Sequence, residues 1–90
     1  MPTKRSDAEI LGSIAANVVR IRRRLDLTQE ELAEAAGLDV RAVQRIERAS
    51  INFGVVALVH LAQSLRTSVA LLVRPTKFLP ARPGRPRARA

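Results

Sequence analysis

Hydrophobic residues recur every three or four positions through the first third of the chain. The members of this stripe are Ile10, Leu11, Ile14, Val18, Ile21 and Leu25. This spacing places side chains on one face of an α-helix, so the sequence predicts a helix from Asp7 or Ala8 to Leu25. Its polar side ends in a cluster of positive charge, made of Arg20, Arg22, Arg23 and Arg24.

The middle of the chain predicts two short helices joined by a tight turn. Thr28 and Glu31 have the spacing of a capping box, in which each side chain binds the backbone N–H of the other. The first of these helices should therefore begin at Gln29. Gly37 should end it, because a residue without Cβ adopts the left-handed conformation easily. Asp39 can then cap the next helix.

The second of these helices has two unlike faces. Val43 and Ile46 share the face that should be buried. The opposite face combines positions i, i+3, i+4 and i+7, which are Arg41, Gln44, Arg45 and Arg48. Caps and glycine stops occur in any helical hairpin, but such a hairpin does not account for an outward stripe of arginine and amide side chains.

These residues resemble the phage-repressor and Cro type (XRE-like) of helix-turn-helix DNA-binding family. The matching positions are Thr28-Gln29, Leu32-Ala33, Gly37, Val43, Ile46 and Glu47. The resemblance implies an all-α fold of four or five helices with a central helix-turn-helix. Asp26 stands where the family usually has glycine, and aspartate tolerates the left-handed backbone expected there.

The resemblance also implies which residues meet double-stranded DNA. The second helix of the motif should enter the major groove with its first turns against base edges. The base-contacting residues are then Val40, Arg41, Gln44 and Arg45. Arginine can bind guanine through two hydrogen bonds, glutamine can bind adenine, and a valine can touch a thymine methyl.

Other positions of the motif have supporting roles in the family. The residues expected at the DNA backbone are Thr28, Gln29, Arg48 and Asn52. Thr28 and Gln29 open a helix whose N-terminus suits a phosphate. Arg22 and Glu47 occupy the positions of a structural ion pair in the family.

A third hydrophobic segment predicts a helix from Gly54 to Leu65. Its inward residues should be Val55, Leu58, Leu61, Ala62 and Leu65. Val56, Ala57 and Val59 make this helix apolar nearly all round, which is typical of a helix buried on both sides. An exposed apolar patch of this extent suggests an interface.

Residues 68–73 extend this apolar pattern. Their periodicity does not separate a short helix from a strand. The family favours a helix, and the alternative is a strand that pairs with its copy in a second subunit. With either structure the expected dimer interface comprises Val56, Val59, Val69, Leu71 and Val73.

Length and charge agree with a small nucleic-acid-binding protein. Ninety residues allow one domain with limited stability, so association into a homodimer would help. The net charge of +8 attracts polyanions, and DNA affinity should fall steeply with salt. There are no cysteines, and no apolar run is long enough to span a membrane. We therefore expect a cytoplasmic, nucleoid-associated protein.

Composition changes abruptly at Arg74. Residues 74–90 contain four of the five prolines and six basic residues, with no periodic apolar stripe, so a disordered tail is expected. The sequence thus divides into a flexible start (1–7), a DNA-binding and dimerisation domain (8–73) and this tail.

Within the tail, residues 82–87 are similar to the AT-hook, a minor-groove motif, except that Pro83 replaces an arginine. Its candidate DNA contacts are Arg82, Arg85 and Arg87. The alternatives to minor-groove contact are nonspecific attraction to phosphates and a solubilising role.

No residue pattern points to catalysis, a metal or a cofactor. His60 is the only histidine and has no acidic partner nearby in sequence. The sequence therefore predicts a non-enzymatic, repressor-like transcriptional regulator that binds a pseudo-palindromic operator as a homodimer. An antitoxin with a toxin partner is the alternative, its neighbouring case being a restriction-modification controller encoded beside a methyltransferase. A nucleoid-associated architectural protein with little sequence preference is a third candidate.

Overall fold

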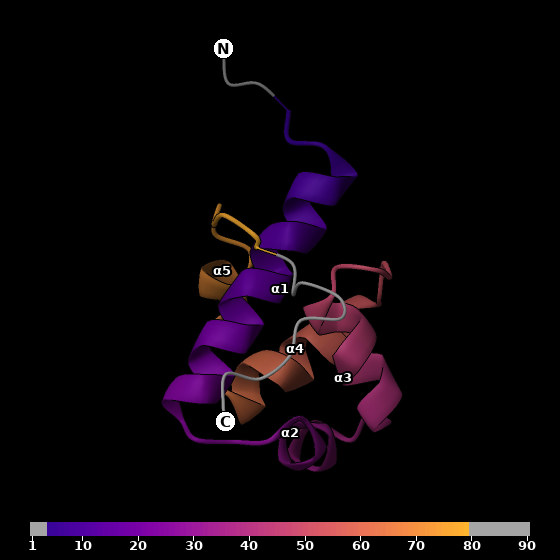
Figure 1. Cartoon of the computed structure of the whole chain (residues 1–90), viewed down its shortest axis with the longest axis vertical. Coiled ribbons are helices and arrows are strands. Elements are labelled where there is room, and N and C mark those ends of the chain that lie inside the picture. The colour runs from indigo at the N-terminus through magenta and orange to yellow at the C-terminus, as the bar shows by residue number, and fades with distance from the viewer. Residues whose placement is uncertain (1–3, 80–90) are drawn as a thin grey trace, which may run out of the picture.

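A computed structural model describes residues 4–79, and its longest element is α1 (Asp7–Arg24), which runs the length of the molecule (Figure 1). Ser6 caps this helix: its Oγ accepts the backbone N–H of Glu9 at 3.1 Å, and Glu9 Oε1 accepts that of Ser6 at 2.8 Å. The capping box fixes the start of α1. The start at Asp7 agrees with the hydrophobic pattern, and the capping box is its physical cause.

The two predicted short helices are confirmed as α2 (Gln29–Ala36) and α3 (Val40–Glu47). Thr28 and Glu31 form the expected capping box ahead of α2, with distances of 2.8 and 3.0 Å. Gly37 ends α2 at φ 70°, and Asp26 adopts φ 62° in the preceding turn. Both left-handed positions were therefore predicted correctly.

The chain continues into α4 (Val55–Ser64) and α5 (Val69–Leu72). Residues 69–72 are thus helical, and residues 4–79 contain five helices and no strand. This confirms the all-α prediction and removes the strand alternative for this segment. No described helix is both long and apolar enough to cross a membrane.

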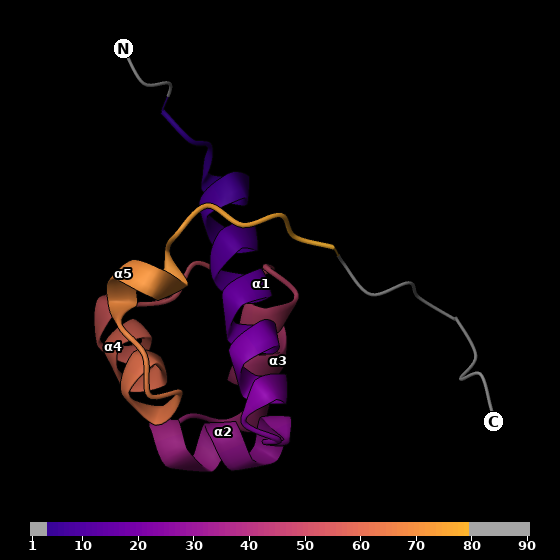
Figure 2. The same ribbon diagram turned by 90° about the vertical axis from the view of Figure 1, so that its left-hand side faces the viewer.

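The core lies among all five helices, where α1 and α5 face α2, α3 and α4. Its fully buried aliphatic residues are Val18, Leu32, Val43, Ile46, Leu61, Leu65 and Leu72. Figure 2 shows α4 and α5 on one side of the molecule, α1 and α3 on the other, and α2 across the end. Each of the five helices contributes at least one of these side chains, so the helices share a single close-packed core.

Two residues of the predicted apolar stripes are exposed. Val55 was expected to face inward, but it is 75% exposed. It is the first residue of α4, three positions before the half-buried Leu58. Leu25 is 37% exposed because it caps the C-terminal end of α1.

Residues 74–79, here called the strap, leave α5 and cross the outside of α1 (Figure 2). Thr76 within the strap hydrogen-bonds to Ser13 and Asn17 of α1. The packed unit therefore extends beyond residue 73, where composition alone set its end. Arg82, Arg85 and Arg87 lie outside the described residues.

Candidate nucleic-acid interface

Helix α3 presents a charged face to solvent because its other face is anchored in the core. Val43 and Ile46 are buried. Arg41 and Arg45 are exposed on the opposite side, whereas Val40 and Gln44 are half-buried at its edges. The stripe predicted from spacing is therefore present, with the two arginines as its most accessible members.

Asp39 and Arg41 are linked at the start of α3. The Asp39 carboxylate accepts the backbone N–H of Arg41 at 2.8 Å, its Nε–H at 3.3 Å and its Nη2–H at 3.2 Å. Hydrogen bonds from the Arg41 side chain and then from its backbone lower the pKa of Asp39 from its usual value. The same side-chain bond raises the pKa of Arg41. Asp39 is therefore both the N-cap and a restraint on the guanidinium.

Arg22 and Glu47 form a two-point ion pair between α1 and α3. Arg22 Nε lies 2.6 Å from Glu47 Oε2, and Arg22 Nη2 lies 3.0 Å from Glu47 Oε1. Arg22 also donates to the carbonyl of Leu27 at 2.8 Å, and Gln29 Nε2 donates to Glu47 Oε1 at 2.9 Å. The pair thus fixes the end of α1, the start of α2 and the end of α3 relative to one another.

The N-terminal end of α2 lies beside this pair. Thr28 is its N-cap and Gln29 its first residue. The side chain of Gln29 is held by Glu47, and that of Thr28 accepts the N–H of Glu31. A phosphate at this end would therefore meet mainly the positive end of the helix dipole and its free N–H groups.

Two further candidates lie after α3. Arg48 is its exposed C-cap, and Asn52 is exposed in the loop that leads to α4. An open hollow is lined by residues of α1, α2, α3 and the strap. It brings Gln29, Gln44 and Arg48 to one surface, whereas Arg41 and Arg45 do not line it.

The candidate interface residues lie on α4 and around α5. Val56 is 68% exposed and Val59 is also exposed. Val69, Leu71 and Val73 pack against the edge of the core and are half-buried. Val55, predicted to face inward, instead adds to the exposed apolar surface of α4.

His60 is exposed on α4, on the same helix as this apolar surface. Across residues 4–79, no three His, Asp or Glu side chains lie close enough to share a metal ion. The chemistry of the described surface is therefore dominated by its arginines and exposed aliphatic residues.

Three buried or half-buried polar contacts were missed from sequence. They are the Gln29–Glu47 bond and the contacts of Ser13 and Asn17 with the strap. Ser13 and Asn17 stand next to stripe positions of α1, and polar residues at the edge of a buried stripe are a signal for a packed partner. The sequence offered nothing to identify residues 74–76 as that partner.

Residues 19–72 match the helix-turn-helix family model HTH_3. The chain belongs to the HTH_3 family, the Cro and phage-repressor type. The match runs from the second half of α1 through α5 and includes the whole of α2 and α3. As an HTH_3 protein, the chain is a DNA-binding helix-turn-helix transcriptional regulator.

Individual HTH_3 proteins and related structures agree with this assignment. An uncharacterized HTH-type transcriptional regulator, y4dJ of Sinorhizobium fredii, is 37% identical over 67 residues, covering 74% of this chain and 87% of the relative. The crystal structure of NHTF, a hypothetical transcription factor from Neisseria, superposes with a TM-score of 0.73 at 26% identity, over 83% of this chain and 87% of that one. The restriction-modification controller C.AhdI of Aeromonas hydrophila gives a TM-score of 0.67 at 31% identity, over 69% and 94% of the two chains.

Proposed function

We propose that this regulator binds a pseudo-palindromic operator as a homodimer and represses transcription by occluding RNA polymerase. The observation that carries the proposal is the exposed face of α3, where Arg41 and Arg45 stand free of the core. Two copies would place their α3 helices in successive major grooves, about 34 Å apart along the DNA.

Within each half-site, Arg41 and Arg45 are the proposed guanine contacts. Gln44 and Val40 stand at the edges of the same face, where they can contact adenine and a thymine methyl. Thr28 and Gln29, at the start of α2, bind the DNA backbone together with Arg48 and Asn52, which follow α3. The buried Arg22–Glu47 pair supports this role because it fixes α2 and α3 relative to each other.

The proposed dimer forms through α4 and α5. Val56 and Val59 supply exposed aliphatic surface on α4, and Val69, Leu71 and Val73 are half-buried around α5. Exposed apolar surface is typical of association sites. The tail residues Arg82, Arg85 and Arg87 are proposed to add phosphate contacts, since the sequence concentrates positive charge there.

The test compares fragments from around the gene's own promoter with random DNA by fluorescence anisotropy at two salt concentrations. The wild type should prefer one fragment, and Arg41→Ala should reduce that preference roughly 5- to 150-fold while salt-sensitive binding to random DNA persists. Arg66→Ala, in the connection between α4 and α5, is the matched control. Equal binding of wild type to every fragment would contradict the operator model and favour the architectural alternative.

A controller of a restriction-modification system is the second candidate. The likeness to C.AhdI, at 31% identity over most of that chain, supports it. An antitoxin would instead use the aliphatic surface of α4 to bind a toxin. Gene neighbourhood separates these cases, because a controller lies beside a methyltransferase gene and an antitoxin beside a small toxin gene.

A further inference from the structure

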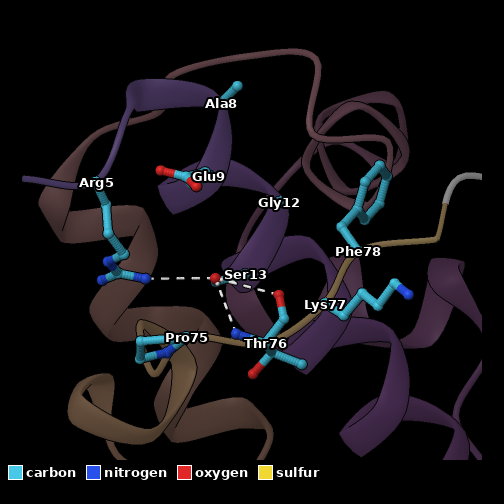
Figure 3. Close-up of a pocket in the computed structure, with 9 residues that line it drawn as sticks. All are labelled: Arg5, Ala8, Glu9, Gly12, Ser13, Pro75, Thr76, Lys77 and Phe78. Carbon is cyan, nitrogen blue, oxygen red and sulfur yellow. Dashed lines mark hydrogen bonds between the residues drawn. The ribbon is translucent and has the colours of Figure 1, made fainter. Parts of the chain in front are cut away.

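The path of the strap over α1 is held by a cluster of polar groups, which we call the clasp: Ser13, Asn17 and Thr76. Thr76 N–H donates to Ser13 Oγ at 3.0 Å, and Ser13 Oγ donates to the Thr76 carbonyl at 3.3 Å (Figure 3). Ser13 is buried in α1. At this point the strap therefore both donates a hydrogen bond to α1 and accepts one from it.

Asn17 makes more hydrogen bonds than Ser13. Its Nδ2 donates to the carbonyls of Leu71, Leu72 and Arg74 at 3.0–3.2 Å. Its Oδ1 accepts from Thr76 Oγ1 at 3.0 Å and from Arg20 Nη2 at 3.1 Å. Asn17 is only 1% exposed, so losing its bonds to the Arg74 carbonyl and Thr76 would be unfavourable, and these two bonds tie the strap to α1.

Gly12 allows the end of the strap to approach α1 closely. A Cβ at residue 12 would lie 3.0 Å from Phe78 Cβ, and the other atoms nearest to it also belong to Phe78. A Cβ here would therefore press against Phe78 of the strap. Gly12 and the clasp together direct the strap as far as Phe78.

The last part of the strap forms one wall of the open hollow beside α3. This hollow has a volume of about 980 Å³, and its lining includes Lys77, Gln29 and Gln44. The cations that line it are Arg20, Arg22, Arg23, Arg48 and Lys77, and the one carboxylate is Glu47. Glu47 is buried and already paired with Arg22. The accessible charge of the hollow is therefore positive.

We propose that this hollow binds phosphates of the DNA backbone and that the strap supplies Lys77 to it. This inference rests on the proposed function, because the hollow adjoins Gln29 and Gln44, which would meet the same DNA. Charge complementarity supports DNA as the occupant, since a backbone offers closely spaced phosphates to lysine and arginine. Leu79, the last described residue of the strap, also lines the hollow.

The test measures how the affinity for DNA depends on salt. The probes are a duplex that the wild type has selected from a random pool and a scrambled duplex of the same composition. Lys77→Gln should reduce the slope of log K against log salt by about 0.9, the value for one phosphate contact, equally on both duplexes. The preference for the selected duplex should not change, because a phosphate contact carries no sequence information. The charge-matched control Arg66→Gln should leave the slope at its wild-type value.

A second variant tests whether the strap delivers the lysine. Gly12→Leu favours helix α1 but should displace Phe78, so it should lower the slope by the same amount although Lys77 is retained. Combining Gly12→Leu with Lys77→Gln should cause no further reduction. If the double variant lowers the slope by the sum of the two single effects, Lys77 binds without the docked strap, and this role of the strap would be overturned.

The outcomes also separate this inference from the proposed function. If Lys77→Gln keeps the wild-type slope while the wild type still prefers its selected duplex, the hollow is not a phosphate site and base recognition stands. If the wild type shows no preference but Lys77→Gln lowers the slope, the hollow binds DNA and the operator model fails. If the wild type binds neither duplex, both are overturned.

Discussion

The carboxylate of Asp39 accepts both the backbone N–H and the guanidinium of Arg41, so one side chain caps α3 and restrains a proposed base contact. The two side chains are 57% and 76% exposed. An ion pair this exposed is weak. The Arg41 guanidinium can therefore leave Asp39 to contact DNA, while Asp39 still accepts the backbone N–H that caps α3. The free protein thus holds Arg41 at the start of α3 at little cost to binding.

Replacing Asp39 should separate these two roles. Asp39→Ser keeps a capping oxygen but removes the negative charge beside Arg41, so it should bind DNA more tightly with nearly unchanged thermal stability. Asp39→Ala should bind more tightly as well but melt at a lower temperature. Anisotropy and thermal melting followed by circular dichroism measure the two effects. Weaker binding by Asp39→Ser would show that the restraint preorganises Arg41.

The Asp39–Arg41 pair should also make stability depend on pH. Because the hydrogen bonds from Arg41 lower the pKa of Asp39 in the folded state, ionised Asp39 stabilises that state at neutral pH. The contribution should decline once the pH falls through the ordinary carboxyl pKa and vanish below the lowered one. Urea unfolding of wild type and Asp39→Asn should therefore give free energies that converge in acid. If the difference in free energy of unfolding between wild type and Asp39→Asn stays constant across these acidic pH values, Asp39 is not the group responsible.

Replacing one partner of the Arg22–Glu47 pair should lower the free energy of unfolding more than replacing both partners. The two side chains are only 11% and 5% exposed, so Glu47→Ala leaves a poorly solvated guanidinium and should lower the free energy of unfolding by about 3–5 kcal/mol. The double variant Arg22→Met/Glu47→Leu should recover most of this loss. Urea denaturation provides the measurement, and additive losses in the double variant would argue against an isolated charge as the cause.

Ala49 is a site where stability can be gained. It follows the C-cap of α3 with φ 57°, a left-handed conformation that costs an alanine energy. Ala49→Gly should raise the free energy of unfolding by roughly 0.4–1 kcal/mol. Ala35→Gly, within the exposed face of α2, should lower it by about 1 kcal/mol. If both substitutions change the free energy of unfolding in the same direction in urea denaturation, the result would contradict this argument from backbone geometry.

The proposed dimer interface can be tested on α4. Val56→Asp and Val59→Asp would place unpaired charge in an apolar contact, so each should shift the protein toward monomer by at least tenfold in dimer Kd, since burying such a charge is unfavourable. Ala35→Asp adds the same charge at an exposed position of α2 and should leave association unchanged. Sedimentation equilibrium distinguishes these results, and unaltered dimerisation of both valine variants would exclude this surface.

Features within a few residues of one another were predictable from sequence. The capping box of Thr28 and Glu31, the stop at Gly37 and the cap at Asp39 each depend on local backbone geometry, and the structure contains all three. The same rule applied to Ser6 and Glu9 would have found the cap of α1. The Arg22–Glu47 pair, 25 positions apart, followed from family resemblance because spacing alone does not bring these residues together.

Longer-range features were not predictable. Asn17 and Thr76 are 59 positions apart, and nothing in a proline-rich, basic segment indicates that it packs on α1. The exposure of Val55 was missed because periodicity gives the face of a helix but not how far its neighbours extend. Whether an apolar helix faces the core or an open surface is decided by the other helices.

The clasp has a practical consequence for where this protein can be shortened. The family match ends at residue 72, and a chain cut there would appear complete by homology. It would lack Thr76 and the Arg74 carbonyl, so Ser13 would lose its bonds to the strap and Asn17 would lose two of its five hydrogen bonds in the middle of α1. The packed unit therefore extends through Phe78, and a shortened version of this protein should end no earlier.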